Sequence, residues 1–160
     1  MGEKRIKGEI LKHCRDEFGE IFVAEKDGTR SLYFGDGILQ SSIRLDQPGS
    51  IIDEYNQSMM SFLLFLREPR SVLLIGLGGC SLVHFLLRAF PSCALDVVEI
   101  RRHVIDLAYE YFLLPKLNPN LRIHHTAGQD FVGLQIGESG NYDLIIVDAF
   151  DDDGPAAALS

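Results

Sequence analysis

The feature that most constrains the fold is an alternation of apolar runs and helix-length segments that begins at residue 71. Four short, nearly continuous apolar runs are separated by three segments of helical length: "SVLLIG", "ALDVVEI", "LRIHH" and "YDLIIVD" around "SLVHFLLRAF", "HVIDLAYEYFLL" and "DFVGLQI". Strands without a polar face are buried on both sides, as parallel strands covered by helices are. The pattern therefore predicts a doubly wound α/β fold with a parallel sheet.

The region before this alternation predicts a small antiparallel β-hairpin unit. Three short runs between residues 20 and 45 are separated by the turn signals "KDGT" and "DG". The next segment, "SIIDEYNQSMMSFLLFL", begins with a cap signal formed by Ser50 and Asp53, and its apolar residues on most faces predict a buried helix. We therefore divide the chain into a front unit, residues 1–48, and an α/β domain, residues 49–160.

Charge and composition narrow the possible ligands. The formal net charge of -8 is unfavourable for binding nucleic acid or an anionic lipid surface, and no apolar run approaches the roughly 18 residues of a membrane span. Three cysteines without close pairing predict a reducing compartment, the cytoplasm. His124 and His125 are adjacent and would point to opposite faces of a strand, so we expect no metal site there. Small molecules or cations are the expected ligands.

A glycine-rich turn follows the first strand of the α/β domain. The stretch "IGLGGCSL" places Gly76 and Gly78 between a strand and a helix, where glycines let a ligand approach the backbone. Glu99 ends the next strand, about 20 residues further on, where a carboxylate can accept both hydroxyls of a ribose. The pair predicts an adenosine-containing ligand, of either the S-adenosylmethionine type or the dinucleotide type.

Five motifs in order resemble the polyamine aminopropyltransferases, or spermidine synthases, and their spermidine-synthase-like relatives: "GDGILQS", "IIDEYNQSMM", "VLLIGLGGCSL", "DVVEI" and "YDLIIVDAFDDDGP". The resemblance implies an N-terminal hairpin domain and a methyltransferase-like, Rossmann-like domain. It also implies transfer of an aminopropyl group from decarboxylated S-adenosylmethionine to putrescine or a related amine, without a metal.

The resemblance assigns roles to particular residues. It implies that Asp148 is the catalytic base and that Asp151 binds the amine. Further amine contacts are implied for Gln40 and Gln57. Contacts to the donor nucleoside are implied for Gly76, Gly78, Glu99, Gly128 and Pro155. The chemistry is sensible in itself, because an attacking amine must lose a proton while its second ammonium group is held by negative charge.

The chain departs from the typical synthase pattern at three places. Gly79 stands where the glycine turn usually carries an aspartate for the aminopropyl amine, and Ala127 stands where an aspartate usually reads the adenine. Gln57 replaces a tyrosine that contacts the amine, although Tyr55 lies nearby. The spermidine-synthase-like relatives also lack the aspartate of the glycine turn, so the resemblance implies that this loss places the chain in their branch.

The chain is also shorter than the family pattern, which predicts a C-terminally truncated form. The expected sheet would have the order 3-2-1-4 and would end with "DLIIV" as an apolar edge strand, a hazard for aggregation or a route to a homo-oligomer. Three other readings stay open: a methyltransferase that uses S-adenosylmethionine itself, an inactive nucleoside-binding or assembly module, and a chain that does not fold stably.

Overall fold

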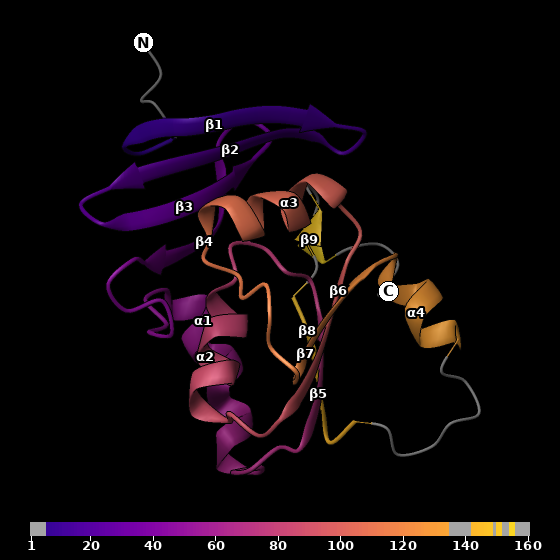
Figure 1. Ribbon diagram of the computed structural model, residues 1–160. Helices are drawn as coiled ribbons and strands as arrows, with labels where there is room; N and C mark the ends of the chain where they lie inside the picture. The colour runs from indigo at the N-terminus through magenta and orange to yellow at the C-terminus, as the bar shows by residue number, and fades with distance from the viewer. Residues whose placement is uncertain (1–5, 135–141, 149, 152–153, 156–160) are drawn as a thin grey trace.

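The computed structural model describes residues 6–134, 142–148, 150–151 and 154–155. The front unit forms an antiparallel four-stranded sheet in the order β1-β2-β3-β4, here called the front sheet. Its strands are β1 (Glu9–Asp16), β2 (Gly19–Lys26), β3 (Thr29–Phe34) and β4 (Ile38–Arg44). Figure 1 shows this sheet above the rest of the molecule.

The first strand was not predicted. Its sequence, EILKHCRD, is largely polar and mostly exposed, because β1 lies at the edge of the front sheet and pairs only with β2. A solvated edge strand lacks the apolar run by which a buried strand is recognised in a sequence. The predicted runs before β4 correspond to β2 and β3.

The segment after the front sheet differs from its prediction in two ways. The helix α1 (Glu54–Met59) is capped by Asp53 rather than Ser50, and it continues as a 3-10 turn, η1 (Met60–Leu64). The prediction that this helix is buried was wrong, because Leu64 and Phe65 are 80% and 89% exposed. Apolar composition does not by itself determine which side chains face the core.

The parallel sheet confirms the predicted order. It consists of β5 (Ser71–Ile75), β6 (Ala94–Glu99), β7 (Leu121–His125) and β8 (Leu144–Val147), arranged β7-β6-β5-β8. Within the described residues, β8 therefore lies at one edge of the sheet. A further short ladder, not predicted, pairs β9 (Phe150–Asp151) with β10 (Gly154–Pro155).

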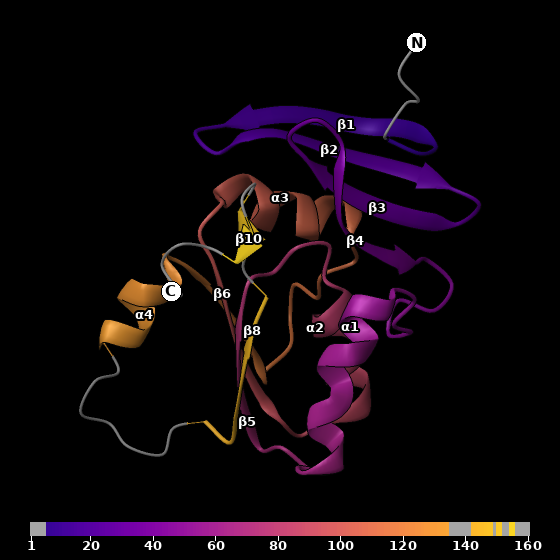
Figure 2. The ribbon, with the colours of Figure 1, turned by 180° about the vertical axis from the view of Figure 1, so that it is seen from behind.

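Helices cover both faces of the parallel sheet, as predicted. The helices α2 (Ser81–Ala89) and α3 (Arg102–Tyr111) pack on one face, while α4 (Gly128–Leu134) packs on the other through Phe131. Figure 2 shows α4 on the opposite side of the sheet from α1 and α2. Right-handed crossovers explain the change of face, because the chain turns back past β5 to reach β8.

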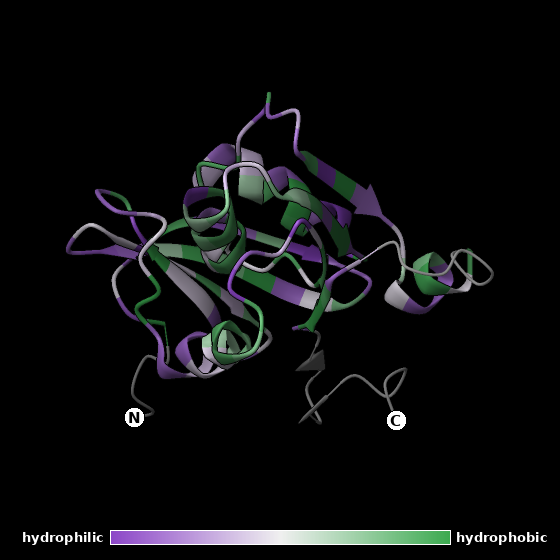
Figure 3. Cartoon of the chain, turned by 90° about the horizontal axis from the view of Figure 1, so that it is seen from below, coloured by the Kyte–Doolittle hydropathy of each residue, from purple (hydrophilic) through white to green (hydrophobic). Residues whose placement is uncertain are grey.

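One hydrophobic core joins the front sheet to the parallel sheet. Ile21 and Leu32 of the front sheet belong to the same buried cluster as Val72, Leu95 and Phe112. Figure 3 shows hydrophobic residues along the central strands and hydrophilic residues in many outer loops. The core fixes the front sheet against the α/β part, so residues of both can meet at one site. The boundary after residue 48 stays a prediction.

Candidate active site

The glycine turn, residues 76–80, joins β5 to α2 through left-handed backbone conformations. Gly76 and Gly78 have φ angles of 101° and 51°, and Cys80 has a φ of 66°, which is unusual for a residue with a Cβ atom. The Gly79 N–H donates a 2.5 Å hydrogen bond to Ser41 Oγ of β4. A Cβ atom at Gly79 would lie 2.7 Å from Ser41 Oγ, so the front sheet packs directly against the glycine turn.

Glu99, the last residue of β6, lies beside this turn, and its role as a ribose ligand stays a prediction. It is 8% exposed; its Oε2 accepts from the Leu77 N–H at 3.0 Å and its Oε1 from the Arg101 N–H at 2.8 Å. Burial raises the pKa of Glu99, and these backbone hydrogen bonds oppose that rise. Each oxygen keeps a lone pair, so the carboxylate can accept further hydrogen bonds from a ligand.

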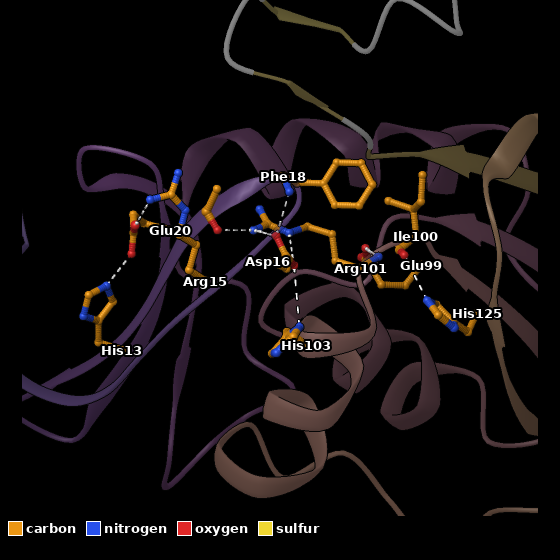
Figure 4. A network of polar contacts seen from close by, with 11 residues as sticks. His13, Arg15, Asp16, Phe18, Glu20, Glu99, Ile100, Arg101, His103 and His125 are labelled. Carbon is orange, nitrogen blue, oxygen red and sulfur yellow. Dashed lines mark hydrogen bonds and ion pairs between the residues drawn. The ribbon is translucent and has the colours of Figure 1, made fainter.

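Arg101 connects Glu99 to the front sheet (Figure 4). Its guanidinium donates to both carboxylate oxygens of Asp16, at 3.0 and 2.7 Å, and to the carbonyl of Gly19 at 3.0 Å. It also lies over the ring of Phe34, 4.2 Å from the ring centroid. The charged side chains of this pair are only 7% and 2% exposed, so the ion pair is buried.

Asp148 follows β8, at the same edge of the sheet as Glu99. Its N–H donates to the Ile75 carbonyl at 2.8 Å. Burial, together with the negative charges of Asp53 and Glu99, raises the pKa of Asp148 to about 6, while the Tyr55 hydrogen bond opposes the rise. Burial, together with the negative charge of Asp148, raises the pKa of Tyr55 to about 12.

The structure brings together four of the residues identified from the sequence: Gly76, Gly78, Glu99 and Asp148. Gly128 begins α4 and packs on the end of β5, where its Cβ position lies 2.7 Å from Ile75 Cγ2. All five positions stand at or next to the carboxyl ends of parallel strands. This edge is where ligands bind in open α/β sheets.

Other predicted residues are not brought to this edge by any contact of the described residues. Gln40 and Gln57 donate to nearby backbone carbonyls, those of Ile38 at 3.4 Å and Ile51 at 3.3 Å. Asp151 and Pro155 lie in β9 and β10, and their side chains are outside the described residues. Their roles therefore stay predictions.

Sequence reasoning missed the parts of the site supplied by α1. Asp53 was interpreted only as part of a helix cap, yet its charge acts on both Tyr55 and Asp148. Tyr55 lies near Gln57 in the sequence but received no predicted role. No local sequence signal distinguishes Tyr55 from other tyrosines at the start of a helix.

The carboxyl-end edge of the parallel sheet carries more negative charge than the positively charged side chains among the described residues neutralise. Asp53 and Asp148, both half-buried, form no ion pair with any described lysine, arginine or histidine. The described residues contain no cluster of three or more side chains suited to a metal ion. A positively charged ligand would supply the missing compensation.

Sequence comparison identifies relatives of this chain. The polyamine aminopropyltransferase of Chromobacterium violaceum is 36% identical over 132 residues, which cover 82% of this chain and 49% of that protein. The chain is related to the polyamine aminopropyltransferases. It spans about half the length of the curated relatives that it matches. Putrescine N-methyltransferase 1 of Nicotiana tabacum is 36% identical over 96 residues, 58% of this chain and 25% of that protein. No family model matches.

Solved structures confirm the fold. A probable spermidine synthase from Corynebacterium glutamicum superposes with a TM-score of 0.68 at 19% identity, over 91% of this chain and 53% of that one. Human methyltransferase-like protein 13, solved in complex with SAH, superposes with a TM-score of 0.55 at 29% identity, over 63% of this chain and 50% of that one. In the described part of the chain, no helix has the length and apolar character needed to span a membrane.

Proposed function

We propose that the protein transfers an aminopropyl group from decarboxylated S-adenosylmethionine to putrescine or a related small amine. The observation that carries the proposal is the uncompensated pair of carboxylates, Asp53 and Asp148, beside a glycine turn and Glu99. A sulfonium donor and a diamine are both cations, so both suit this edge of the sheet. The names of the aminopropyltransferase relatives support the same reaction.

In this reaction the amine nitrogen attacks the carbon attached to the sulfonium sulfur. A C–N bond forms, the C–S bond breaks, and its electron pair stays on sulfur, which leaves as the neutral thioether of methylthioadenosine. The nitrogen's surplus proton passes to Asp148, whose pKa of about 6 keeps it ionised but basic near neutral pH. Glu99 holds the ribose, and the glycine turn accommodates the rest of the donor.

A methyltransferase is the second candidate. Gly79 leaves the turn without the carboxylate expected for a decarboxylated donor, and a putrescine N-methyltransferase is among the relatives. The same attack on a sulfonium carbon would then form a C–N bond to a methyl group and release S-adenosylhomocysteine. Asp148 and Glu99 would keep their roles, so the two candidates differ in the donor, the group transferred and the nucleoside released.

Product analysis by mass spectrometry separates these candidates. The protein is incubated with putrescine and either donor, and spermidine with methylthioadenosine is the expected result. N-methylputrescine with S-adenosylhomocysteine would establish the methyltransferase instead. Methylthioadenosine binding without any product would favour the inactive module. Asp148→Asn should abolish transfer, whereas Asp106→Asn, on the exposed face of α3, should not.

We further propose that the protein works in the cytoplasm, since Cys14, Cys80 and Cys93 are all free thiols.

Self-association through β8 also stays a prediction. Ile145 and Val147 of this strand are 56% and 40% exposed among the described residues, which supports pairing with a second copy. Sedimentation at increasing protein concentration would test it, and a monomer throughout would contradict it.

A further inference from the structure

Arg101 is the N-cap residue of α3, a position that does not by itself favour arginine. Helix caps are usually Ser, Thr, Asp or Asn, whose side chains accept hydrogen bonds from the free N–H groups of the first turn. The Arg101 side chain makes no such bond, although its carbonyl accepts from the Val104 N–H at 3.0 Å and so begins the helix. Helix capping therefore does not explain an arginine here.

The Arg101 backbone instead holds the Glu99 carboxylate. Its N–H donates to Glu99 Oε1 at 2.8 Å, while the Leu77 N–H of the glycine turn donates to Oε2 at 3.0 Å. Because one donor binds each oxygen, the carboxylate is oriented between the glycine turn and the start of α3. A shift of Arg101 would rotate the carboxylate, and with it the lone pairs that a ligand could use.

The Arg101 side chain is held by the ends of three strands of the front sheet. Its guanidinium binds both carboxylate oxygens of Asp16 at the end of β1 (Figure 4). It also binds the carbonyl of Gly19 at the start of β2 and lies over the ring of Phe34 at the end of β3. An apolar side chain could fill the same space, but a guanidinium with two parallel hydrogen bonds to a carboxylate also fixes direction. The front sheet therefore determines where Arg101 lies.

A second arginine links the front sheet to the other end of α3. Arg30 of β3 donates to the Tyr111 carbonyl at 2.7 Å and to Glu25 Oε2 at 3.1 Å. Among the described residues, the hydrogen bonds and the ion pair of Arg30 do not reach Glu99 or the glycine turn. The two links thus hold the same helix against the same sheet, but only the Arg101 link ends on the site.

We propose that Arg101 and Asp16 are positioning residues for Glu99, through which the front sheet sets the affinity of the site for its nucleoside. Calling Glu99 the ribose ligand rests on the proposed function, but the link from the front sheet to Glu99 does not. Neither Arg101 nor Asp16 touches the ligand, because both act through the orientation of the Glu99 carboxylate. Loss of the link should therefore raise the KM for the donor and leave kcat nearly unchanged.

The test is calorimetry with methylthioadenosine, which is uncharged near neutral pH and therefore reports the geometry of Glu99 rather than long-range charge. Asp16→Asn and Arg101→Lys are each measured alone and combined with Glu99→Gln. Lysine keeps the backbone N–H and the positive charge but cannot bind both oxygens of Asp16 in parallel. Alone, each substitution should weaken binding by about 3- to 30-fold. Combined with Glu99→Gln, each should have a much smaller effect, because the group through which it acts has been altered.

The matched control is Glu25→Gln, which disturbs the link at the other end of α3 and should leave the affinity unchanged. Circular dichroism and melting temperature show which variants are folded at the temperature of the titration, and Arg101→Lys decides the test if Asp16→Asn is unfolded. Unchanged affinity in the folded variants would overturn the inference, as would equal weakening with and without Glu99→Gln. The expected affinities together with no transfer product from the wild type would refute the proposed function and leave the inference standing.

Discussion

Replacing Asp16 by Asn should destabilise the protein by about 3 kcal/mol at neutral pH, at the lower end of the cost of breaking a buried ion pair. The pair qualifies as buried because the side chains of Asp16 and Arg101 are 2% and 7% exposed. Asparagine keeps the shape and one acceptor oxygen, which is why the lower end applies. The loss arises because the Arg101 guanidinium stays in place without a compensating charge.

The stability difference should depend on pH. Burial would by itself raise the pKa of Asp16, but the hydrogen bonds from Arg101 and the Phe18 N–H, with the nearby positive charges, lower it below its usual value. Stability from a carboxylate with a lowered pKa is present above the unfolded-state pKa, about 3.9, and is lost as the pH falls through the folded-state pKa. The wild type and Asp16→Asn should therefore converge in strongly acidic solution.

Urea unfolding followed by circular dichroism at pH 7 and near pH 3 measures both effects. Asp46→Asn, in the exposed pair with Arg44 next to the front sheet, is the matched control and should leave the urea midpoint unchanged. The same Asp16→Asn protein should bind methylthioadenosine more weakly, because the Arg101 backbone holds Glu99. Equal urea midpoints for wild type and Asp16→Asn at pH 7 would refute this reasoning, as would a difference that persists unchanged in acid.

Two further substitutions examine the glycine turn and the carboxylate beside it. Gly79→Ala should lower the free energy of unfolding by about 1–3 kcal/mol, since its Cβ would lie 2.7 Å from Ser41 Oγ and 3.0 Å from Phe112 Cε1. An unchanged urea midpoint would show that the front sheet can move to make room for the methyl group. Glu99→Gln should weaken methylthioadenosine binding by about 10- to 100-fold in calorimetry, because hydrogen bonds to an ionised carboxylate are lost. Undiminished affinity would argue against Glu99 as the ribose ligand.

The parallel sheet could be predicted because a strand buried on both faces has a continuous apolar sequence. Val72 and Leu74 face one layer of helices and Leu73 and Ile75 the other side, so the whole run of β5 is apolar. The order of the strands followed from the family resemblance. By contrast β1 is solvated, and its strand character depends on pairing with β2 rather than on its own composition.

Only those site residues could be predicted that belong to a recognisable pattern within one short segment of the sequence. Glycines at a strand end and Glu99 at the next strand end belong to such segments, and the structure places them together. The link between Asp16 and Arg101 joins residues 85 positions apart, and neither residue is unusual in its local sequence. The effect of Tyr55 on the pKa of Asp148 is equally long-range. Contacts of this kind arise from packing, and no local pattern records them.

The strand order also implies a sequence of assembly. The front sheet forms from consecutive hairpins, whereas Val72 of β5 pairs with Leu95 on one side and with Leu144, much later in the chain, on the other. Pairings between distant segments form slowly because a long loop must close first. We therefore expect β8 to join after the other strands as the chain leaves the ribosome. Asp148 follows β8, so the glycine turn should form in nascent molecules before the carboxylate that we propose as the base is in place.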